Sequence, residues 1–241
     1  MTVTITPDNV TICTVSRLSE PDFMQRSLLA RSFIVAPGAR PTQLKLLPGN
    51  QPPNRTKGLS EAYNEFLGEA RNDDYLIFVH DDVFVHDWFL FDRLREAFSE
   101  FDVVGVAGSG TPDLRQPSWG LQFTSDLTPT GWQNRANKSG AVGHGDPGTP
   151  AVSVYGPTPA PCELLDGLFL AVNVKRLRQA GVSFDTRFRF HCYDLDFCRT
   201  ARAAGLRLGT WPIAVTHASA GNFDSNAWKE AAKVYLEKWS E

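Results

Sequence analysis

The feature that most constrains this 241-residue chain is a run of five apolar residues, Tyr75–Val79, that leads directly into His80, Asp81 and Asp82. Apolar residues without alternation are typical of a strand buried on both faces, as in a parallel sheet covered by helices. In such sheets, ligands bind at the carboxyl ends of the strands. Two adjacent carboxylates there repel each other and lose hydration, which favours a divalent cation. The alternative is a turn in which Asp81 or Asp82 caps a helix that begins near Asp87.

Strand-like and amphipathic helical segments alternate along the chain. Apolar or β-branched runs predict strands at residues 10–15, 43–47, 75–79, 103–107, 166–172 and 211–215. Helical periodicity predicts helices at about residues 21–31, 59–70, 88–98, 195–204 and 228–239, and a helix through Leu177 that ends at Gly181. This alternation predicts an α/β fold, a single doubly wound, Rossmann-like domain with a mostly parallel central sheet.

The middle of the chain has a different composition. Between Gly105 and Pro161 lie 10 of the 19 glycines and 8 of the 16 prolines. We expect a long Gly/Pro-rich insertion made of loops, with room for a short hairpin, because its aromatic residues are too apolar for a solvated linker. Trp119 and Trp132 in this insertion could stack on sugar rings, or they could simply pin the loop to the core.

Composition excludes several classes of protein. Hydrophobic residues make up 42% and charged residues 21%, which argues against disorder and fibrous repeats. The net charge of -3 offers no basic surface for nucleic acid. No apolar stretch approaches the roughly 20 residues of a membrane-spanning helix, and the first nine residues hold no apolar signal core. The four cysteines include no Cys-x-x-Cys pair, so we expect reduced thiols and a cytoplasmic setting.

Two further places could carry chemistry. Asp194 stands at the start of an expected helix, close to His191 and Tyr193, and all three could line one pocket. Helix N-capping by Asp194 explains the carboxylate equally well. His217 ends an expected strand and is followed by small residues that let a ligand approach, although a histidine there can also be an ordinary surface residue. The chain has no nucleophile elbow, no phosphate-binding P-loop and no dinucleotide-binding glycine motif.

Taken in order, these segments resemble the family 2 glycosyltransferases of the GT-A fold. The resemblance lies in residues 75–83, which are similar to the Asp-x-Asp segment, and in residues 166–172, 184–198 and 217–221. It is nearest to the streptomycin-biosynthesis StrF-like branch, with His-x-Asp-Val at residues 80–83 and Phe-His-x-Tyr-Asp-x-Asp-Phe at residues 190–197. Ala62-Tyr63-Asn64 and the late Lys238-Trp239 also match that branch.

The resemblance implies an enzyme that moves a sugar from a nucleotide-diphospho-sugar to an acceptor hydroxyl, with inversion at the anomeric carbon. Asp194 matches the general base. Asp82 and His217 match residues that hold Mn²⁺ or Mg²⁺ with the diphosphate, and His80 occupies the position of the motif's first acid. Tyr193 stands where the family usually has a glutamate.

The resemblance also implies two halves within residues 1–241, a nucleotide-binding half of about residues 1–108 and an acceptor-side half of about residues 109–241. The residues expected to bind the nucleotide are Ser16, Asn50, Asn64 and Asp81. Those expected on the acceptor side are Asp166, Trp119, His191 and Tyr193. The acceptor would be a saccharide, a glycan or a small molecule, and peripheral contact with a membrane stays open.

Two other functions remain possible on the sequence alone. One is a catalytically silent nucleotide-sugar-binding or scaffold domain of the same fold, suggested by the departures at His80 and Tyr193. The other is a nucleotidyltransferase, which needs a basic, Gly-rich phosphate loop after the first strand. Residues 16–19 offer little of that.

Overall fold

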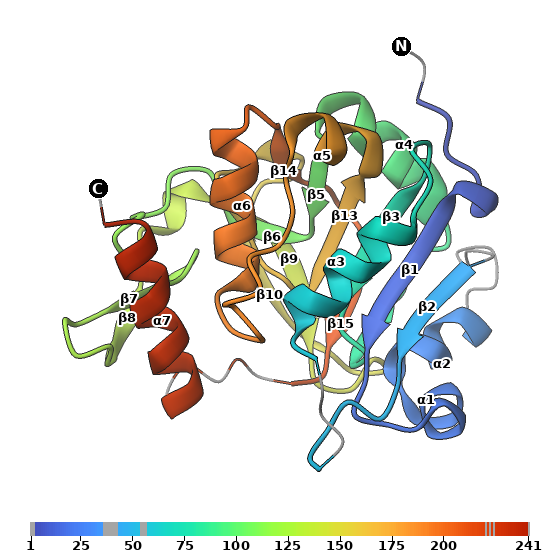
Figure 1. Ribbon diagram of the computed structural model, residues 1–241, viewed down its shortest axis with the longest axis horizontal. Coiled ribbons are helices and arrows are strands. Elements are labelled where there is room, and N and C mark those ends of the chain that lie inside the picture. Colours follow the sequence, from blue (N-terminus) through green and yellow to red (C-terminus); the bar gives the residue numbers. More distant parts are fainter. Residues whose placement is uncertain are drawn as a thin grey trace.

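A seven-stranded mixed sheet forms the centre of the computed structural model, which describes residues 3–35, 43–53, 57–219, 221, 223 and 225–240 (Figure 1). The strand order is β11-β14-β5-β13-β3-β1-β2. Strands β1, β2, β3, β5 and β14 run in one direction, and β13 and β11 run in the other, so the expected mostly parallel sheet is confirmed. The strands are β1 (Val10–Val15), β2 (Gln43–Leu47), β3 (Tyr75–Val79), β5 (Val103–Gly105), β11 (Ala160–Pro161), β13 (Phe169–Asn173) and β14 (Leu208–Thr210).

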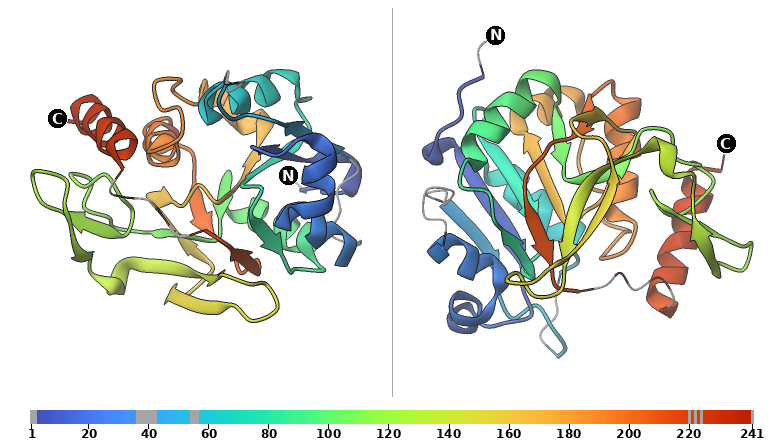
Figure 2. Two further views of the ribbon diagram at one scale, coloured as in Figure 1. Left: turned by 90° about the horizontal axis from the view of Figure 1, so that it is seen from below. Right: turned by 180° about the vertical axis from the view of Figure 1, so that it is seen from behind.

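Helices cover both faces of this sheet. Helices α3, α5 and α6 lie on the face turned to the viewer in Figure 1, and α4 lies on the opposite face, in front in the right panel of Figure 2. The helices in the described residues are α1 (Glu20–Arg26), α2 (Leu28–Val35), α3 (Leu59–Glu69), α4 (Leu90–Glu100), α5 (Val174–Ala180), α6 (Tyr193–Ala203) and α7 (Asn226–Lys238).

The single helix expected at residues 21–31 is two helices. Ser27 adopts extended backbone dihedrals and ends α1. Its hydroxyl then accepts a hydrogen bond from the backbone N–H of Ala30, at 3.0 Å, and so caps α2. The helix expected from residue 88 begins at Leu90 instead, and Trp88 and Phe89 remain exposed. These differences arise from capping, which periodicity alone does not locate.

A second sheet packs behind the first, on the side of α4 (Figure 2). Its strand order is β12-β6-β9-β15-β4, and β10 pairs with β9. A separate hairpin joins β7 and β8. The strands are β4 (Val83–Val85), β6 (Ala107–Ser109), β7 (Leu121–Phe123), β8 (Pro129–Trp132), β9 (Lys138–His144), β10 (Ala151–Gly156), β12 (Leu164–Leu165) and β15 (Val215–His217).

The insertion is therefore more ordered than loops with one hairpin. Some of its glycines are close-approach residues inside strands. A Cβ atom on Gly140 would lie 1.9 Å from the carbonyl oxygen of Val106, and one on Gly156 would lie 1.9 Å from that of Lys138. Only glycine fits such contacts, so these residues allow strands to pack instead of breaking them.

Two expected strands also divide differently. The segment at residues 103–107 leaves the central sheet after Gly105 and enters the second sheet at Ala107. Residues 211–214, expected within a strand, connect β14 to β15. Val106 and Ile213 are buried at these two boundaries, so the apolar character of the sequence continues across each of them and conceals it.

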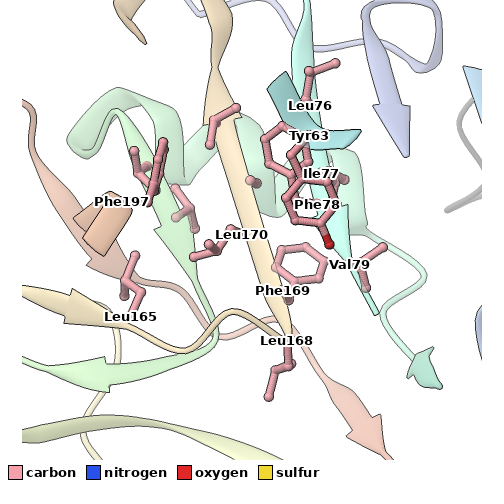
Figure 3. Close-up of a cluster of buried hydrophobic side chains, with 14 of the residues drawn as sticks. Tyr63, Leu76, Ile77, Phe78, Val79, Leu165, Leu168, Phe169, Leu170 and Phe197 are labelled. Carbon is pink, nitrogen blue, oxygen red and sulfur yellow. The ribbon is translucent and has the colours of Figure 1, made fainter. Parts of the chain in front are cut away.

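Aromatic and aliphatic side chains from β3, β13, α3 and α6 fill the core of the protein (Figure 3). Phe78 is fully buried, and its ring centroid lies 4.5 Å from that of Tyr63 and 5.2 Å from that of Phe184. Phe184 in turn stacks on Phe197, at 4.3 Å. Truncating a buried phenylalanine in such a cluster costs about 3–5 kcal/mol. This packing holds the end of β3 in place.

The four cysteines are buried and free, as expected for reduced thiols. Among the described residues, none of the helices combines the length and the apolar character that a bilayer crossing requires.

Candidate functional site

The turn between β3 and β4 presents the acidic segment at one edge of the central sheet. The backbone N–H of His80 donates to the carbonyl of Leu168, and that of Val83 donates to the carbonyl of His80. Strand β4 follows immediately, so Asp81 and Asp82 do not cap a helix. The carboxylate that bonds to the backbone before the next helix is that of Asp87, which accepts a hydrogen bond from the N–H of Phe89 at 2.9 Å. The helix-capping alternative for this segment is wrong.

His80, Asp82 and His217 gather at this edge. One possible ligand atom from each lies within 4.8 Å of those from the other two. Strand β15 runs antiparallel to β4, which sets His217 opposite Val83 and brings its Nε2 atom to 3.3 Å from a carboxylate oxygen of Asp82. Residues 82 and 217 are therefore joined by strand pairing.

The electrostatics of this triad follow from the pairing of a carboxylate with an imidazole. Burial would raise the pKa of Asp82, but the hydrogen bond and charge of His217 hold that pKa well below its usual range. Burial would lower the pKa of His217, and the Asp82 carboxylate more than offsets this and raises it. Burial, and then the neighbouring His217, lower the pKa of His80. Asp82 is thus a carboxylate at neutral pH, available to a cation.

The donor set fits a divalent metal ion. Two imidazoles and one carboxylate form a mixed set of nitrogen and oxygen donors. Such a set binds transition-metal ions more tightly than it binds Mg²⁺. The 4.8 Å limit on the separation of the ligand atoms allows one ion to reach all three. An ion would replace the Asp82–His217 contact and leave further coordination positions open.

Ser16, Asn50 and Asp81 also come together. The Ser16 hydroxyl donates a short hydrogen bond to a carboxylate oxygen of Asp81. The backbone N–H of Asn50 donates to the Ser16 carbonyl at 2.8 Å. Burial raises the pKa of Asp81, although the Ser16 hydrogen bond opposes this. These residues follow β1, β2 and β3, whose parallel pairing aligns their carboxyl ends.

Asn64, also expected to bind the nucleotide, makes its side-chain hydrogen bonds with a different segment of the chain. Its amide Nδ2 donates to the carbonyl of Phe184 at 2.8 Å, and its Oδ1 accepts from the N–H of Phe184 at 2.9 Å. Both ends of the amide are thus engaged with the segment before α6. This structural explanation is sufficient for the presence of asparagine on α3.

Asp166 and Asp194 form a carboxylate pair near the triad. Asp194 is in the first turn of α6, and its Oδ2 accepts from the backbone N–H of Gly167 at 2.9 Å. Asp166 accepts from the indole N–H of Trp119 at 2.9 Å and from the N–H of Leu168 at 3.0 Å. The charge of Asp166 acts on Asp194 and also on both histidines of the triad. The two groups therefore form one electrostatic cluster.

Asp194 has the properties of a proton acceptor for neutral pH. Burial, followed by the negative charge of Asp166, raises the pKa of Asp194 to about 7. The helix N-terminus and the Gly167 N–H stabilise the ionised form and keep the shift from being larger. Cys192, the residue before α6, has a left-handed φ of 60°, a strained conformation for a residue with a side chain. Strain of this kind often accompanies residues held in functional positions.

Tyr193 links the two groups. Its hydroxyl lies 3.1 Å from Nε2 of His80 and donates to the carbonyl of Gly167 at 2.8 Å. The ring itself is buried. His191 lies two residues earlier and is half-buried against the ring of Phe190, with centroids 4.8 Å apart. Tyr193 thus connects the start of α6 to the triad.

Two residues of this site were not expected as functional residues. The Ser219 hydroxyl lies 3.1 Å from Nε2 of His217, and the half-exposed ring of Phe190 stacks on His80 with centroids 6.4 Å apart. Each belongs to a motif that the sequence analysis identified, so its position beside a histidine in that motif is the signal that could have found it. Ala220, within the last motif, lies outside the described residues.

An aromatic cluster extends from Asp166 toward the surface. The Tyr155 ring meets Trp119 edge-on at 5.0 Å and lies 5.8 Å from the ring of Trp132. Lys138 places its Nζ atom 4.5 Å from the centre of a Trp132 ring. Trp119 is buried, whereas Trp132 is 48% exposed. One hydrogen bond therefore connects an exposed aromatic surface to the carboxylate pair.

Comparisons with known proteins give only structural likenesses. No family model matches the chain, and no curated protein matches it. The mannosyltransferase PcManGT from Pyrobaculum calidifontis, solved with GDP-Man and Mn²⁺, is 15% identical, with a TM-score of 0.46 over 99% of this chain and 66% of its own. A197 from STIV is 14% identical, with a TM-score of 0.43 over 87% of this chain and 82% of its own.

TarS from S. aureus, residues 1–349, is 12% identical, with a TM-score of 0.42 over 86% of this chain and 60% of its own. The chain thus spans just under two thirds of the length of PcManGT and less of TarS. Likenesses at this level of identity concern the fold alone.

Proposed function

We propose that this protein is an inverting glycosyltransferase that moves a sugar from a nucleotide-diphospho-sugar to an acceptor hydroxyl. The observation that carries the proposal is the meeting, at one sheet edge, of a His–Asp–His triad with a carboxylate whose pKa is about 7. Tyr193 bridges the two. The order of the sequence motifs supports the same activity and the StrF-like branch of the family.

The donor nucleotide would bind where β1, β2 and β3 end. Ser16 and Asn50 lie side by side there, and the Asp81 carboxylate is held by the Ser16 hydroxyl. A carboxylate in this position can accept hydrogen bonds from hydroxyl groups of a ribose. In this proposal residues 1–108 form the nucleotide-binding half of one unit, and residues 109–241 form its acceptor-side half.

His80, Asp82 and His217 would hold a divalent ion beside the diphosphate. When bound, such an ion neutralises the charge that develops on the leaving diphosphate. Because two of the three ligands are imidazoles, we expect Mn²⁺ to bind more tightly than Mg²⁺. The contribution of the chain is to keep Asp82 ionised and to hold the two histidines around it.

Asp194 would act as the general base. A base is most effective when its pKa is close to the working pH, because it is then often ionised and still accepts a proton readily. The N–H of Gly167 fixes one carboxylate oxygen, which orients the group. Removing the proton from the incoming hydroxyl on the side opposite the diphosphate leads to inversion.

The acceptor would enter over the aromatic cluster of Trp119, Trp132 and Tyr155. Aromatic rings bind the apolar face of a sugar, and the half-exposed Trp132 can do so at the surface. Asp166, held by Trp119, borders the base and can accept a hydrogen bond from the acceptor. His191, half-buried near the start of α6, is the remaining candidate on this side.

A thermal-shift screen tests the donor site. Wild type and Asp82→Asn are heated with a panel of nucleoside diphosphates and nucleotide sugars, with Mn²⁺ and with a chelator. Ligands that bind only the folded protein raise its melting temperature according to their affinity. We expect at least one nucleoside diphosphate to stabilise wild type with Mn²⁺ and to stabilise Asp82→Asn much less. No shift in wild type with any nucleotide would refute the proposal.

A further inference from the structure

The Tyr193 hydroxyl has one proton and interacts with three polar groups: the Gly167 carbonyl, Nε2 of His80 and the Tyr63 hydroxyl. It lies 2.8 Å from the carbonyl oxygen of Gly167, which can only accept a hydrogen bond, so the proton of the hydroxyl is directed there. The second neighbour is Nε2 of His80, at 3.1 Å. Since its only proton is already engaged, the Tyr193 oxygen can join His80 only as an acceptor.

This assignment determines where His80 carries its own proton. A neutral imidazole has one N–H and one nitrogen with a lone pair, and the hydrogen bond at one nitrogen decides which is which. We infer that Tyr193 is a positioning residue that holds His80 as the Nε2–H tautomer and so keeps its Nδ1 lone pair available to a metal ion. The tautomer follows from hydrogen bonding alone, and only its use by a metal rests on the proposed function.

The surroundings of Tyr193 fix its hydroxyl firmly enough for this role. The side chain is 4% exposed, and its ring meets the Tyr63 ring edge-on at 5.8 Å. Gly167 is required for the contact, because a Cβ atom there would lie 2.4 Å from the Tyr193 hydroxyl oxygen. The hydroxyl therefore cannot rotate away without leaving the Gly167 carbonyl buried and unpaired.

The same peptide segment connects this hydrogen bond to the second carboxylate group. Asp194 accepts from the N–H of Gly167, while Tyr193 donates to its C=O. Tyr193 and Asp194, at the start of α6, therefore hydrogen-bond to the C=O and the N–H of Gly167, respectively. A shift of α6 would move the Asp194 carboxylate and the His80 ring together.

Nuclear magnetic resonance of ¹⁵N-histidine-labelled protein tests the tautomer directly. Long-range ¹H–¹⁵N spectra at pH 8 distinguish a protonated ring nitrogen from one with a lone pair, and His80→Gln identifies the His80 signals. We expect wild type without metal to show His80 protonated at Nε2. We expect Tyr193→Phe to lose this preference and show a mixture or the opposite tautomer. Protonation at Nδ1 in wild type overturns the inference without any variant.

Mn²⁺ titration by calorimetry supplies the second readout. Partners that orient a metal-binding histidine typically contribute 10–100-fold to metal affinity, so we expect Tyr193→Phe to bind Mn²⁺ at least about 10-fold more weakly. Tyr235→Phe, which also removes a buried phenol hydroxyl but lies on α7, should keep wild-type affinity. Equal Mn²⁺ affinity in wild type and Tyr193→Phe overturns the role assigned to Tyr193. If the tautomer and the Mn²⁺ affinities are as expected but no nucleotide sugar is bound or cleaved, only the proposed function fails.

Discussion

Replacing Asp194 by asparagine should make the protein more stable while removing its transferase activity. The pKa of this carboxyl is about 7 in the folded chain, against about 3.9 for an unfolded aspartate. A difference of about 3 units corresponds to about 4 kcal/mol, the cost of keeping the group charged in the fold. Asparagine has nearly the same shape and can still accept the Gly167 N–H, but it carries no charge.

The sign of the effect depends on pH. Below about pH 4 the carboxyl is protonated in both folded and unfolded chains, so the variant and wild type should be equally stable. Between about pH 4 and pH 7 only the unfolded chain releases the proton, and wild type progressively loses stability relative to Asp194→Asn. Above pH 7 the difference is constant.

Thermal melts of the two proteins from pH 4 to pH 8 measure this difference. For a chain of this size, 1 kcal/mol shifts the melting temperature by roughly 2–4 °C. Because Asp194 keeps some contact with water, we expect Asp194→Asn to melt on the order of 5–10 °C higher at pH 8. Asp185→Asn is a control in which the stability should change in the opposite direction. The Arg187 hydrogen bond, then Lys238, hold the pKa of Asp185 well below its usual range, so this variant should be less stable at pH 8. A lower melting temperature for Asp194→Asn at pH 8 would refute the reasoning.

Three further predictions concern the same site. Asp166→Asn removes the negative charge beside Asp194 and should move the ascending limb of the pH–rate profile, expected near pH 7, to lower pH; an unmoved limb would count against Asp194 as the base. Trp132→Ala should raise the KM for the acceptor and leave nucleotide-sugar hydrolysis in the absence of acceptor unchanged, which steady-state kinetics with both substrates can check. Gly167→Ala should abolish activity, because the added Cβ would lie 2.8 Å from that of Asp194; normal turnover would show that the Gly167 contacts are dispensable.

The sequence predicted the half of the site that depends on parallel strands. Strand β3 is apolar throughout and ends just before His80, and the parallel pairing of β1, β2 and β3 brings Ser16 and Asn50 to the same edge as Asp81. These residues are close in space because the carboxyl ends of parallel strands lie at the same edge of a sheet, which is where ligands bind. The sequence analysis expected Ser16 and Asn50 at the site from the resemblance, and the positions of the strands supply the physical reason for their proximity to Asp81.

The contact between Asp82 and His217 needed more than that. It arises because β15 pairs with β4, a three-residue strand that the sequence analysis did not identify. Short strands give no periodicity, and their pairing depends on the second sheet as a whole. Only the resemblance of the motifs placed these two residues in one site.

The insertion shows the same limitation in another form. Its glycines were interpreted as chain breakers, yet Gly140 and Gly156 lie within strands that approach other backbones closely. Composition reports that a residue has no side chain, but it does not report whether a turn or a close contact requires this. The difference becomes visible only when the partner strand is known.

The two positions that depart from the resembled motifs contact each other. His80 stands where the family has an acid, Tyr193 stands where it usually has a glutamate, and the two side chains are hydrogen-bonded. Considered separately along the sequence, each departure suggested lost activity. Together they form one arrangement in which a buried phenol orients an imidazole.

Release of nucleoside diphosphate from a panel of nucleotide sugars, followed over time with Mn²⁺ and with a chelator, tests the central claim most directly. We expect wild type to cleave at least one donor slowly to water with Mn²⁺, with the chelator stopping the reaction and Asp82→Asn showing little of it. Binding of a nucleotide sugar with Mn²⁺ but no release of nucleoside diphosphate, with or without acceptors, would contradict the account. The protein would then be a nucleotide-sugar-binding domain without transferase activity.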